Sequence, residues 1–270
     1  MSQQIIEKFK TAVIKNNSVV CVGLDADVSK LPAGIDQVSF NKAIIDATHD
    51  LVCAYKPNSA FYEALGEKGI SNLKQTCDYI NEKYPEIPII LDAKRADIGN
   101  TNQGYVDFAF EYLGVDAITV QPYMGGEAVQ PFLDRVDKGI IVLCRTSNDG
   151  SAEFQDLEVD GTPLYKIVAE NVAENWNKNN NCMLVVGATY PQEIAEVRAI
   201  VGDDMWFLIP GIGAQGGDVE KTVKSAKNSE GQGMIINSSR GIIFASNGAD
   251  FAETARAKTV ELRDEINKYR

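Results

Sequence analysis

The sequence predicts an α/β fold, a single (β/α)8 TIM barrel, in one domain that spans residues 1–270. Three observations predict it. Short apolar, β-branched runs recur along the chain, longer amphipathic segments separate them, and no linker rich in proline or serine divides the chain. Continuous apolar runs are typical of parallel strands buried on both faces, and a chain of 270 residues is ordinary for one such barrel.

Eight segments are expected to form the strands. They start at residues 18 (SVVCVGL), 51 (LVCAYK), 87 (IPIILDAK), 115 (VDAITVQ), 139 (GIIVLCR), 182 (CMLVVG), 205 (MWFLIP) and 233 (GMIINS). Amphipathic patterns predict helices from residue 72 and over residues 101–113, 126–136, 162–176, 191–201 and 218–225. An N-terminal helix (1–17) and a C-terminal helix (249–270) flank the barrel (18–248). The longest stretch without periodicity, 146–161, is a candidate functional loop.

The composition excludes several classes of protein. The formal net charge of −12 disfavours nucleic acid and anionic membranes as partners. No apolar run reaches the length of a membrane span and the N-terminus lacks a signal-peptide core, so we expect a cytoplasmic protein. Cys21, Cys53, Cys144 and Cys182 fall inside apolar runs without CxxC spacing, which indicates core thiols rather than a metal site.

Charged and polar side chains lie at the ends of the first three predicted strands or just after them, and the carboxyl ends of these strands should meet on one face of a barrel. The residues are Asp25, Lys56, Asn58, Asp92, Lys94 and Asp97. Side chains two apart on a strand share a face, so Asp92 and Lys94 should project together. An ion pair at a strand end is the simpler interpretation of D-x-K alone. Several opposite charges in a barrel mouth are costly as scaffolding, however, which favours a pre-arranged field for catalysis.

The ends of the later strands are also polar. The fifth strand ends in Arg145, Thr146 and Ser147. The seventh is followed by a segment with Gly211, Gly213, Gly216 and Gly217, and Asp218 then begins a helix, while Arg240 follows the eighth. Backbone amides freed by glycine, together with an arginine, suit a phosphate. A tight turn also needs glycine, so the glycines alone carry little weight.

The segment IILDAKRADIGNT (residues 89–101) resembles the signature of the orotidine 5′-phosphate decarboxylases. Four further segments, CVGLD, AYKPN, PGIGAQGGD and NSSRG, match other active-site segments of that family in the same order. The similarity runs from about residue 18 to residue 240, and the KR within the motif and the KPN segment are similar to the longer branch of the family.

This resemblance implies a cofactor-free, metal-free decarboxylation of orotidine 5′-phosphate to UMP and CO2 in de novo pyrimidine biosynthesis. It implies that Lys94 protonates the ring carbon that loses the carboxylate, with Asp92 against the departing group and Lys56 binding Asp92 and the ribose. It also implies a homodimer, in which Asp97, Ile98 and Thr101 enter the neighbouring subunit's site.

The resemblance assigns the remaining substrate contacts by position. Asp25 and Asn58 match ribose-side positions, and Thr146, or its neighbour Ser147, would read the pyrimidine edge. Gln215 and Arg240 would hold the phosphate with backbone at Gly241, and Pro210 belongs to the same substrate-binding set. The segment 211–217 is a candidate lid.

Other functions remain open at this stage. Magnesium-dependent sugar-phosphate decarboxylases and synthases share D-x-K-x-x-D, but they have a metal-binding glutamate where this chain has Lys56. A Schiff-base aldolase would need a lysine on a central strand such as the sixth, and CMLVVG has none. A non-catalytic nucleotide-binding barrel is the alternative outside enzymes, and the presence of Asp92 and Lys94 disfavours it.

Overall fold

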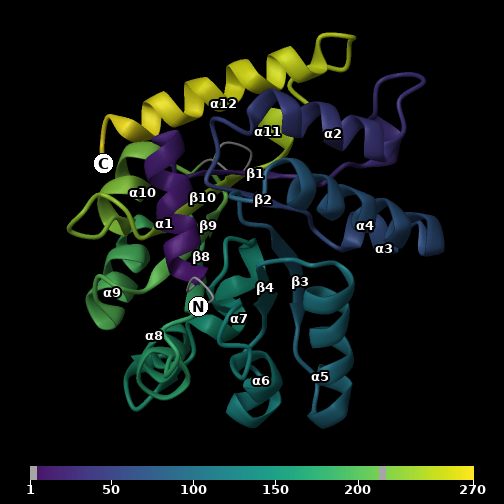
Figure 1. Cartoon of the computed structure of the whole chain (residues 1–270). Coiled ribbons are helices and arrows are strands. Elements are labelled where there is room, and N and C mark those ends of the chain that lie inside the picture. The colour runs from purple at the N-terminus through teal and green to yellow at the C-terminus, as the bar shows by residue number, and fades with distance from the viewer. Residues whose placement is uncertain (1–4, 213–216) are drawn as a thin grey trace.

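Eight parallel strands form a barrel at the centre of the protein (Figure 1). The computed structural model describes residues 5–212 and 217–270. The predicted (β/α)8 barrel is confirmed, because the strands follow the order β2-β1-β10-β9-β8-β5-β4-β3 with parallel pairing throughout. The strands are β1 (Val20–Gly23), β2 (Ala54–Lys56), β3 (Ile90–Arg95), β4 (Ala117–Val120), β5 (Gly139–Arg145), β8 (Cys182–Val186), β9 (Trp206–Pro210) and β10 (Met234–Ser238).

Strands β2 and β3 meet to close the barrel. Two isolated parallel bridges, Tyr55–Ile89 and Asn58–Asp92, join them. The backbone N–H of Asp92 also donates to the carbonyl of Pro57 at 3.0 Å. Closure therefore brings the end of β2 against Asp92.

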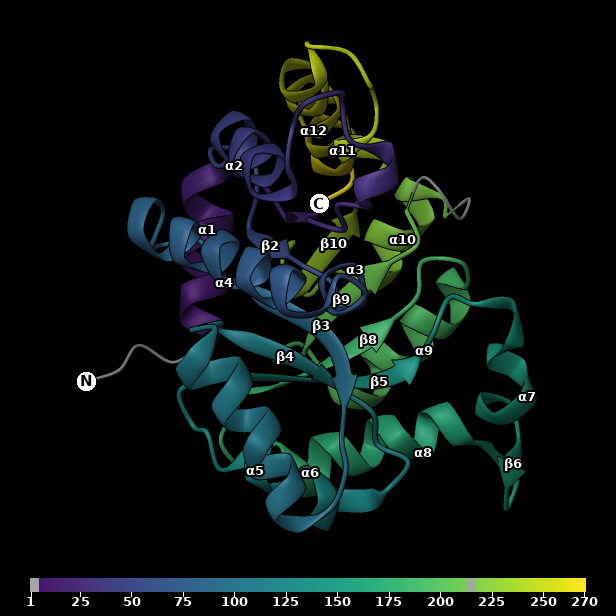
Figure 2. The same ribbon diagram turned by 90° about the vertical axis from the view of Figure 1, so that its right-hand side faces the viewer.

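Helices surround the barrel (Figures 1 and 2). Two π-helical segments, Asp107–Tyr112 and Val172–Trp176, extend α5 and α8. No helix within residues 5–212 and 217–270 is long and apolar enough to span a bilayer. The helices are α1 (Ile5–Asn16), α2 (Gln37–Thr48), α3 (Ala60–Glu63), α4 (Gly66–Lys83), α5 (Gly99–Val106), α6 (Gly125–Leu133), α7 (Ala152–Gln155), α8 (Leu164–Asn171), α9 (Pro191–Val201), α10 (Val219–Ala226), α11 (Arg240–Ile243) and α12 (Phe251–Asn267).

Helix α1 covers the amino-terminal end of the barrel. Phe9 is fully buried, and its ring centroid lies 6.1 Å from that of Trp206, which begins β9. Lys8 Nζ pairs with Asp116 Oδ1, just before β4, at 2.7 Å. This end is opposite to the one where the sequence places the site.

Each predicted strand overlaps an observed one, whereas some helix ends differ for local reasons. Helix α4 begins at Gly66 rather than at residue 72, and α5 begins at Gly99 rather than at 101. Helix α8 begins at Leu164 because β7 (Thr162–Pro163) pairs with β6 (Glu158–Val159) in a short hairpin. This hairpin and α7 lie at the periphery of the molecule, away from the barrel strands (Figure 2).

Candidate active site

A cavity of about 180 Å³ opens at the carboxyl ends of the barrel strands. Six residues predicted for the site line it: Asp25, Lys56, Asn58, Asp92, Pro210 and Arg240. Gly211, Ile212, Asn237, Ser238 and Ser239 complete its wall. These residues come from distant parts of the sequence, so the closed barrel is what brings them together.

Asp92, in the wall of this cavity, is the centre of a charged cluster that also includes Lys94, which does not line the cavity. Its Oδ2 accepts hydrogen bonds from Lys56 Nζ at 2.9 Å and from Asn58 Nδ2 at 3.2 Å. Its Oδ1 accepts from Lys94 Nζ at 2.6 Å and from Thr119 Oγ1 at 3.0 Å. The structure thus places one carboxylate between two ammonium groups, which we call the Lys56–Asp92–Lys94 cluster.

Burial and charge fix the ionisation of the two inner groups. Lys56 is 4% exposed and Asp92 9%, whereas the side chain of Lys94 is 49% exposed. Burial would raise the pKa of Asp92, but the charges and hydrogen bonds of Lys56 and Lys94 hold that pKa well below its usual range. Burial would lower the pKa of Lys56, yet the carboxylates of Asp92 and Asp25 raise it well above its ordinary value. Both inner groups are therefore charged at neutral pH.

Asp92 and Lys94 meet, but strand β3 is not regular there as their spacing predicted. Strand β3 pairs with β4 at Leu91–Ile118 and next at Arg95–Val120, with a register shift between the two pairs. Lys94 adopts a left-handed backbone with φ of 48°, which is uncommon for a residue other than glycine. A bulge, and not the simple alternation of a strand, turns the lysine toward Asp92.

Asp97, Ile98 and Thr101 lie outside the Lys56–Asp92–Lys94 cluster in the single chain. Asp97 Oδ1 accepts from the backbone N–H of Ile98 at 2.7 Å. Among the described residues, no hydrogen bond or ion pair joins Asp97 to the cluster. The side chain of Ile98 is 55% exposed, and Thr101 is also exposed.

Asn102, which the sequence analysis did not single out, fixes the loop that carries these residues. It is fully buried, and its Oδ1 accepts from the N–H of Asp97 at 2.7 Å. Its Nδ2 donates to the carbonyls of Asp97 and Ala128. The loop after β3 is thus tied to α6.

Arg145 points away from the cavity, although it ends strand β5 as predicted. The pairing of β5 with β8 shifts register between Leu143 and Arg145. The guanidinium is buried, and its Nη2 donates to Glu193 Oε1 of α9 at 3.2 Å and its Nη1 to Ser151 Oγ at 3.1 Å. Arg145 therefore anchors the loop after β5.

Thr146 and Ser147 follow Arg145. One of the two was predicted to contact the edge of the pyrimidine. Gln155 of α7 holds Thr146 twice: its Oε1 accepts from the Thr146 N–H at 2.9 Å, and its Nε2 donates to the Thr146 hydroxyl at 2.8 Å. That hydroxyl donates to Asn148 Oδ1 at 2.6 Å. The loop predicted to be functional thus includes a residue, Gln155, that positions Thr146.

The structure describes some of the residues that were predicted to bind the phosphate. Arg240 begins α11 and is exposed, and no described side chain pairs with its guanidinium. Gly241 is also exposed, and Gly211 has a φ of 105°, which favours glycine. Gln215, like Gly213 and Gly216 of the candidate lid, lies outside the described residues.

Two polar strand residues were not singled out from the sequence: Thr119, which contacts Asp92, and Asn237, which lines the cavity. Asn237 is 8% exposed, and its Oδ1 has no hydrogen-bond partner among the described residues. A buried polar atom of this kind is commonly satisfied by a ligand or water. The available signal was a polar residue that follows apolar ones within a predicted strand: Thr119 in VDAITVQ and Asn237 in GMIINS.

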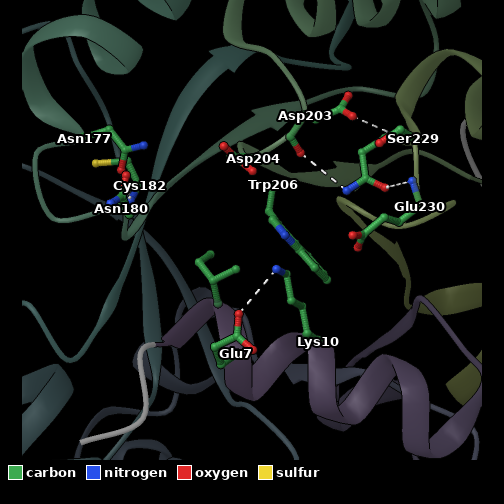
Figure 3. A pocket seen from close by; sticks show the side chains of 12 residues that line it. Glu7, Lys10, Asn177, Asn180, Cys182, Asp203, Asp204, Trp206, Ser229 and Glu230 are labelled. Carbon is green, nitrogen blue, oxygen red and sulfur yellow. Dashed lines mark hydrogen bonds and ion pairs between the residues drawn. The ribbon is translucent and has the colours of Figure 1, made fainter.

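A larger hollow of about 400 Å³ lies at the other end of the barrel, between α1 and the starts of β8 and β9 (Figure 3). Four carboxylate residues line it: Glu7, Asp203, Asp204 and Glu230. Its lysine, Lys10, pairs with Glu7 at 3.3 Å. An acidic wall disfavours a phosphate ligand, so the smaller cavity is the better candidate for the predicted chemistry.

Comparisons with known proteins identify the family of the chain. The model of the orotidine 5′-phosphate decarboxylase / HUMPS family matches residues 18–255. The chain is 53% identical over 272 residues to the orotidine 5′-phosphate decarboxylase of Cellvibrio japonicus, with 98% of each chain covered. It is 51% identical to that of Ralstonia pickettii, again over 98% of each. The solved structure of Leishmania donovani OMP decarboxylase superposes with a TM-score of 0.86 at 38% identity, covering 99% of this chain and 98% of the other.

Proposed function

The chain belongs to the orotidine 5′-phosphate decarboxylase family, and we propose that its Lys56–Asp92–Lys94 cluster performs the family's reaction. The enzyme decarboxylates orotidine 5′-phosphate to UMP and CO2 in pyrimidine biosynthesis. The alternative of a magnesium-dependent sugar-phosphate enzyme is not favoured, since the curated relatives named above are orotidine 5′-phosphate decarboxylases. We also propose that the chain forms a single domain. As an enzyme of a biosynthetic pathway, it is proposed to act in the cytoplasm.

The proposed chemistry rests on one observation: an ionised Asp92 lies between Lys56 and Lys94, at 2.9 and 2.6 Å. When the bond between the pyrimidine ring and its carboxylate breaks, the electron pair stays on the ring carbon and CO2 leaves. The Lys94 ammonium stabilises this developing charge and then transfers a proton to the carbon. The neutral amine left behind recovers its proton from water.

Lys56 and Asp92 have supporting roles in this proposal. Asp92 faces the departing carboxylate and keeps the Lys94 ammonium in place through the 2.6 Å hydrogen bond. Lys56 compensates the charge of Asp92 from the buried side and reaches the ribose with Asp25 and Asn58. Because these groups are fixed before substrate arrives, little reorganisation is needed in the reaction.

The remaining predicted residues are proposed to bind the rest of the substrate. Arg240, with backbone at Gly241 and with Gln215, holds the phosphate, and Pro210 lines the same wall. Thr146, held by Gln155, reads the pyrimidine edge. Binding energy from a phosphate far from the reacting bond can contribute to the acceleration through positioning.

We propose a homodimer in which Asp97, Ile98 and Thr101 complete the neighbouring site. Two features support it: in the described residues no hydrogen bond or ion pair joins Asp97 to the cluster of its own chain, and large apolar side chains are exposed on the face of the barrel that carries the site. Ile98, after β3, is 55% exposed, while Tyr123, after β4, is 89% exposed and Phe154 of α7 58%; the last two line one hollow. Exposed apolar surface of this kind marks an interaction site.

Lys94→Ala tests the proposed proton donor. We expect kcat to fall by about 10⁴-fold or more, because proton donation and charge stabilisation are both lost, while binding of UMP, measured by calorimetry, changes less than tenfold. Lys258→Ala, which removes an exposed lysine on the outer helix α12, is the matched control and should leave kcat unchanged. A Lys94→Ala enzyme with near-normal kcat would refute the assignment.

Chelation separates the two enzyme classes. Decarboxylation of orotidine 5′-phosphate, followed by ultraviolet absorbance, is expected to proceed at the same rate with and without EDTA. Loss of activity that added Mg²⁺ restores would contradict a metal-free reaction and indicate a metal-dependent enzyme.

A further inference from the structure

The hydroxyl of Thr119 contacts three atoms of the catalytic motif. Thr119 lies on β4 and is 1% exposed. Its Oγ1 accepts hydrogen bonds from the backbone N–H groups of Ala93 and Lys94, both at 2.9 Å, and donates one to Asp92 Oδ1 at 3.0 Å. A threonine hydroxyl has one donor and two acceptor positions, so its full capacity is used here.

The direction of these hydrogen bonds is fixed by the groups involved. A backbone N–H can only donate, and the ionised Asp92 carboxylate can only accept. The donor and acceptor roles of the threonine hydroxyl are therefore fixed. The hydroxyl holds the backbone of Lys94, and it orients the carboxylate that pairs with the Lys94 ammonium.

The bulge in β3 explains why this link is needed. Between the pairs Leu91–Ile118 and Arg95–Val120, strand β3 has three residues opposite the single Thr119 of β4. The usual strand pairing is interrupted there, so the N–H groups of the bulge need other acceptors. The Thr119 hydroxyl supplies the acceptor at the left-handed Lys94, a conformation that persists only when its surroundings fix it.

We infer that Thr119 is a positioning residue of the decarboxylase, which holds the β3 bulge so that the Lys94 ammonium and the Asp92 carboxylate point at the reacting carbon. This inference rests on the proposed function. Thr119 does not line the walls formed by Arg240, Asp25 and Asn58, so its loss should impair the chemical step and not the binding of phosphate and ribose.

The test compares Thr119→Val, which keeps the shape and removes the hydroxyl, with Thr119→Ser, which keeps the hydroxyl. We expect Thr119→Val to lower kcat about 100-fold, as for a small displacement of a reacting group, with KM and UMP affinity within about threefold of wild type. Thr119→Ser should recover kcat to within about fivefold of wild type, because it restores all three hydrogen bonds.

Thr259→Val is the matched control. Thr259 is also fully buried, but its hydroxyl donates to the carbonyl of Ala255 within α12, at 2.8 Å. Loss of the Thr259 hydroxyl in Thr259→Val should leave kcat within about twofold of wild type. If Thr119→Val does not fold, as judged by circular dichroism, Thr119→Cys provides the comparison, since a thiol hydrogen-bonds weakly, and the same selective loss of kcat is expected.

The inference would be overturned by a Thr119→Val or Thr119→Cys enzyme with normal kcat, by a rise in KM without a fall in kcat, or by a Thr119→Ser enzyme as slow as the valine variant. These results differ from failure of the proposed function. In that case wild type itself would not decarboxylate orotidine 5′-phosphate, or Lys94→Ala would remain active.

Discussion

Four hydrogen-bond donors converge on the two oxygens of Asp92, and two of them are lysine ammonium groups. Lys56 has almost no access to water, so Asp92 is the main group that compensates its charge. Removing one member of a buried ion pair costs more stability than replacing both members by apolar residues, because it leaves an uncompensated buried charge. Asp92 therefore contributes to stability as well as to the proposed reaction.

Asp92→Asn should lower the free energy of unfolding at pH 7 by about 3 kcal/mol, the lower end for a broken buried pair. The pKa of Asp92 is depressed in the folded state, so its contribution is complete above the unfolded pKa, about 3.9, and is lost as the pH falls toward the folded value. The difference between wild type and variant should thus be equal at pH 7 and 5 and smaller at pH 3, as measured by urea unfolding.

A suitable control for this series is Asp134→Asn, at the exposed end of α6, which accepts a hydrogen bond from Gln130. Its effect should stay below about 0.5 kcal/mol. A difference for Asp92→Asn that grows on acidification would contradict the assigned direction of the pKa shift.

Among the secondary-structure elements, the strands were predictable and the helix ends less so. Parallel strands buried on both faces require continuous apolar runs, so GIIVLCR and CMLVVG identify β5 and β8 at almost their full extent. The predicted start of α8, at residue 162, was wrong. Thr162 pairs with Val159 in the β6–β7 hairpin, and this pairing prevents residues 162 and 163 from joining the helix.

The site was predictable to the extent that it depends on strand ends. A closed barrel gathers the last residues of its strands, which is why Lys56, Asp92 and Arg240 could be grouped without a structure. Arg145 shows the limit: a register shift in β5 moves a strand-end side chain to the other face, and periodicity does not reveal such shifts. Thr119 was missed for the same reason, because its role depends on the bulge in β3.

Arg145→Ala should destabilise the protein by about 3–5 kcal/mol, because it leaves Glu193 without its buried partner. The loop after β5 should loosen, and since Gln155 holds Thr146 from that loop, KM for orotidine 5′-phosphate should rise. Arg145→Lys should rescue only part of the loss, because one ammonium cannot contact Glu193 and Ser151 together. Urea unfolding and steady-state kinetics measure both effects.

Arg256→Ala is the corresponding control for an exposed pair. Arg256 contacts both carboxylate oxygens of Asp50 at 2.6 and 2.8 Å, but both side chains are nearly half exposed. Its loss should cost about 1 kcal/mol or less. If Arg145→Ala and Arg256→Ala lowered the free energy of unfolding equally, burial of Arg145 would not strengthen its ion pair.

At the scale of the whole molecule, the proposed dimer makes each site depend on two chains. Lys94 and Asp92 come from one subunit, whereas Asp97 would come from its neighbour. Lys94→Ala and Asp97→Ala are then each nearly inactive as homodimers. In a mixed dimer one site receives both defects and the other receives none, so activity should return on mixing.

Co-expression of the Lys94→Ala and Asp97→Ala chains with different affinity tags, followed by two-step purification, isolates the mixed dimer. We expect about half of the wild-type activity per dimer, since one of two sites is intact. Lys94→Ala mixed with Asp92→Asn is the control: both defects lie in the cluster of a single chain, so each site keeps one defect and no recovery is expected. Activity no higher than in the homodimers for the first mixture, or recovery in the second, would mean that Asp97 acts within its own chain and that the sites are not shared.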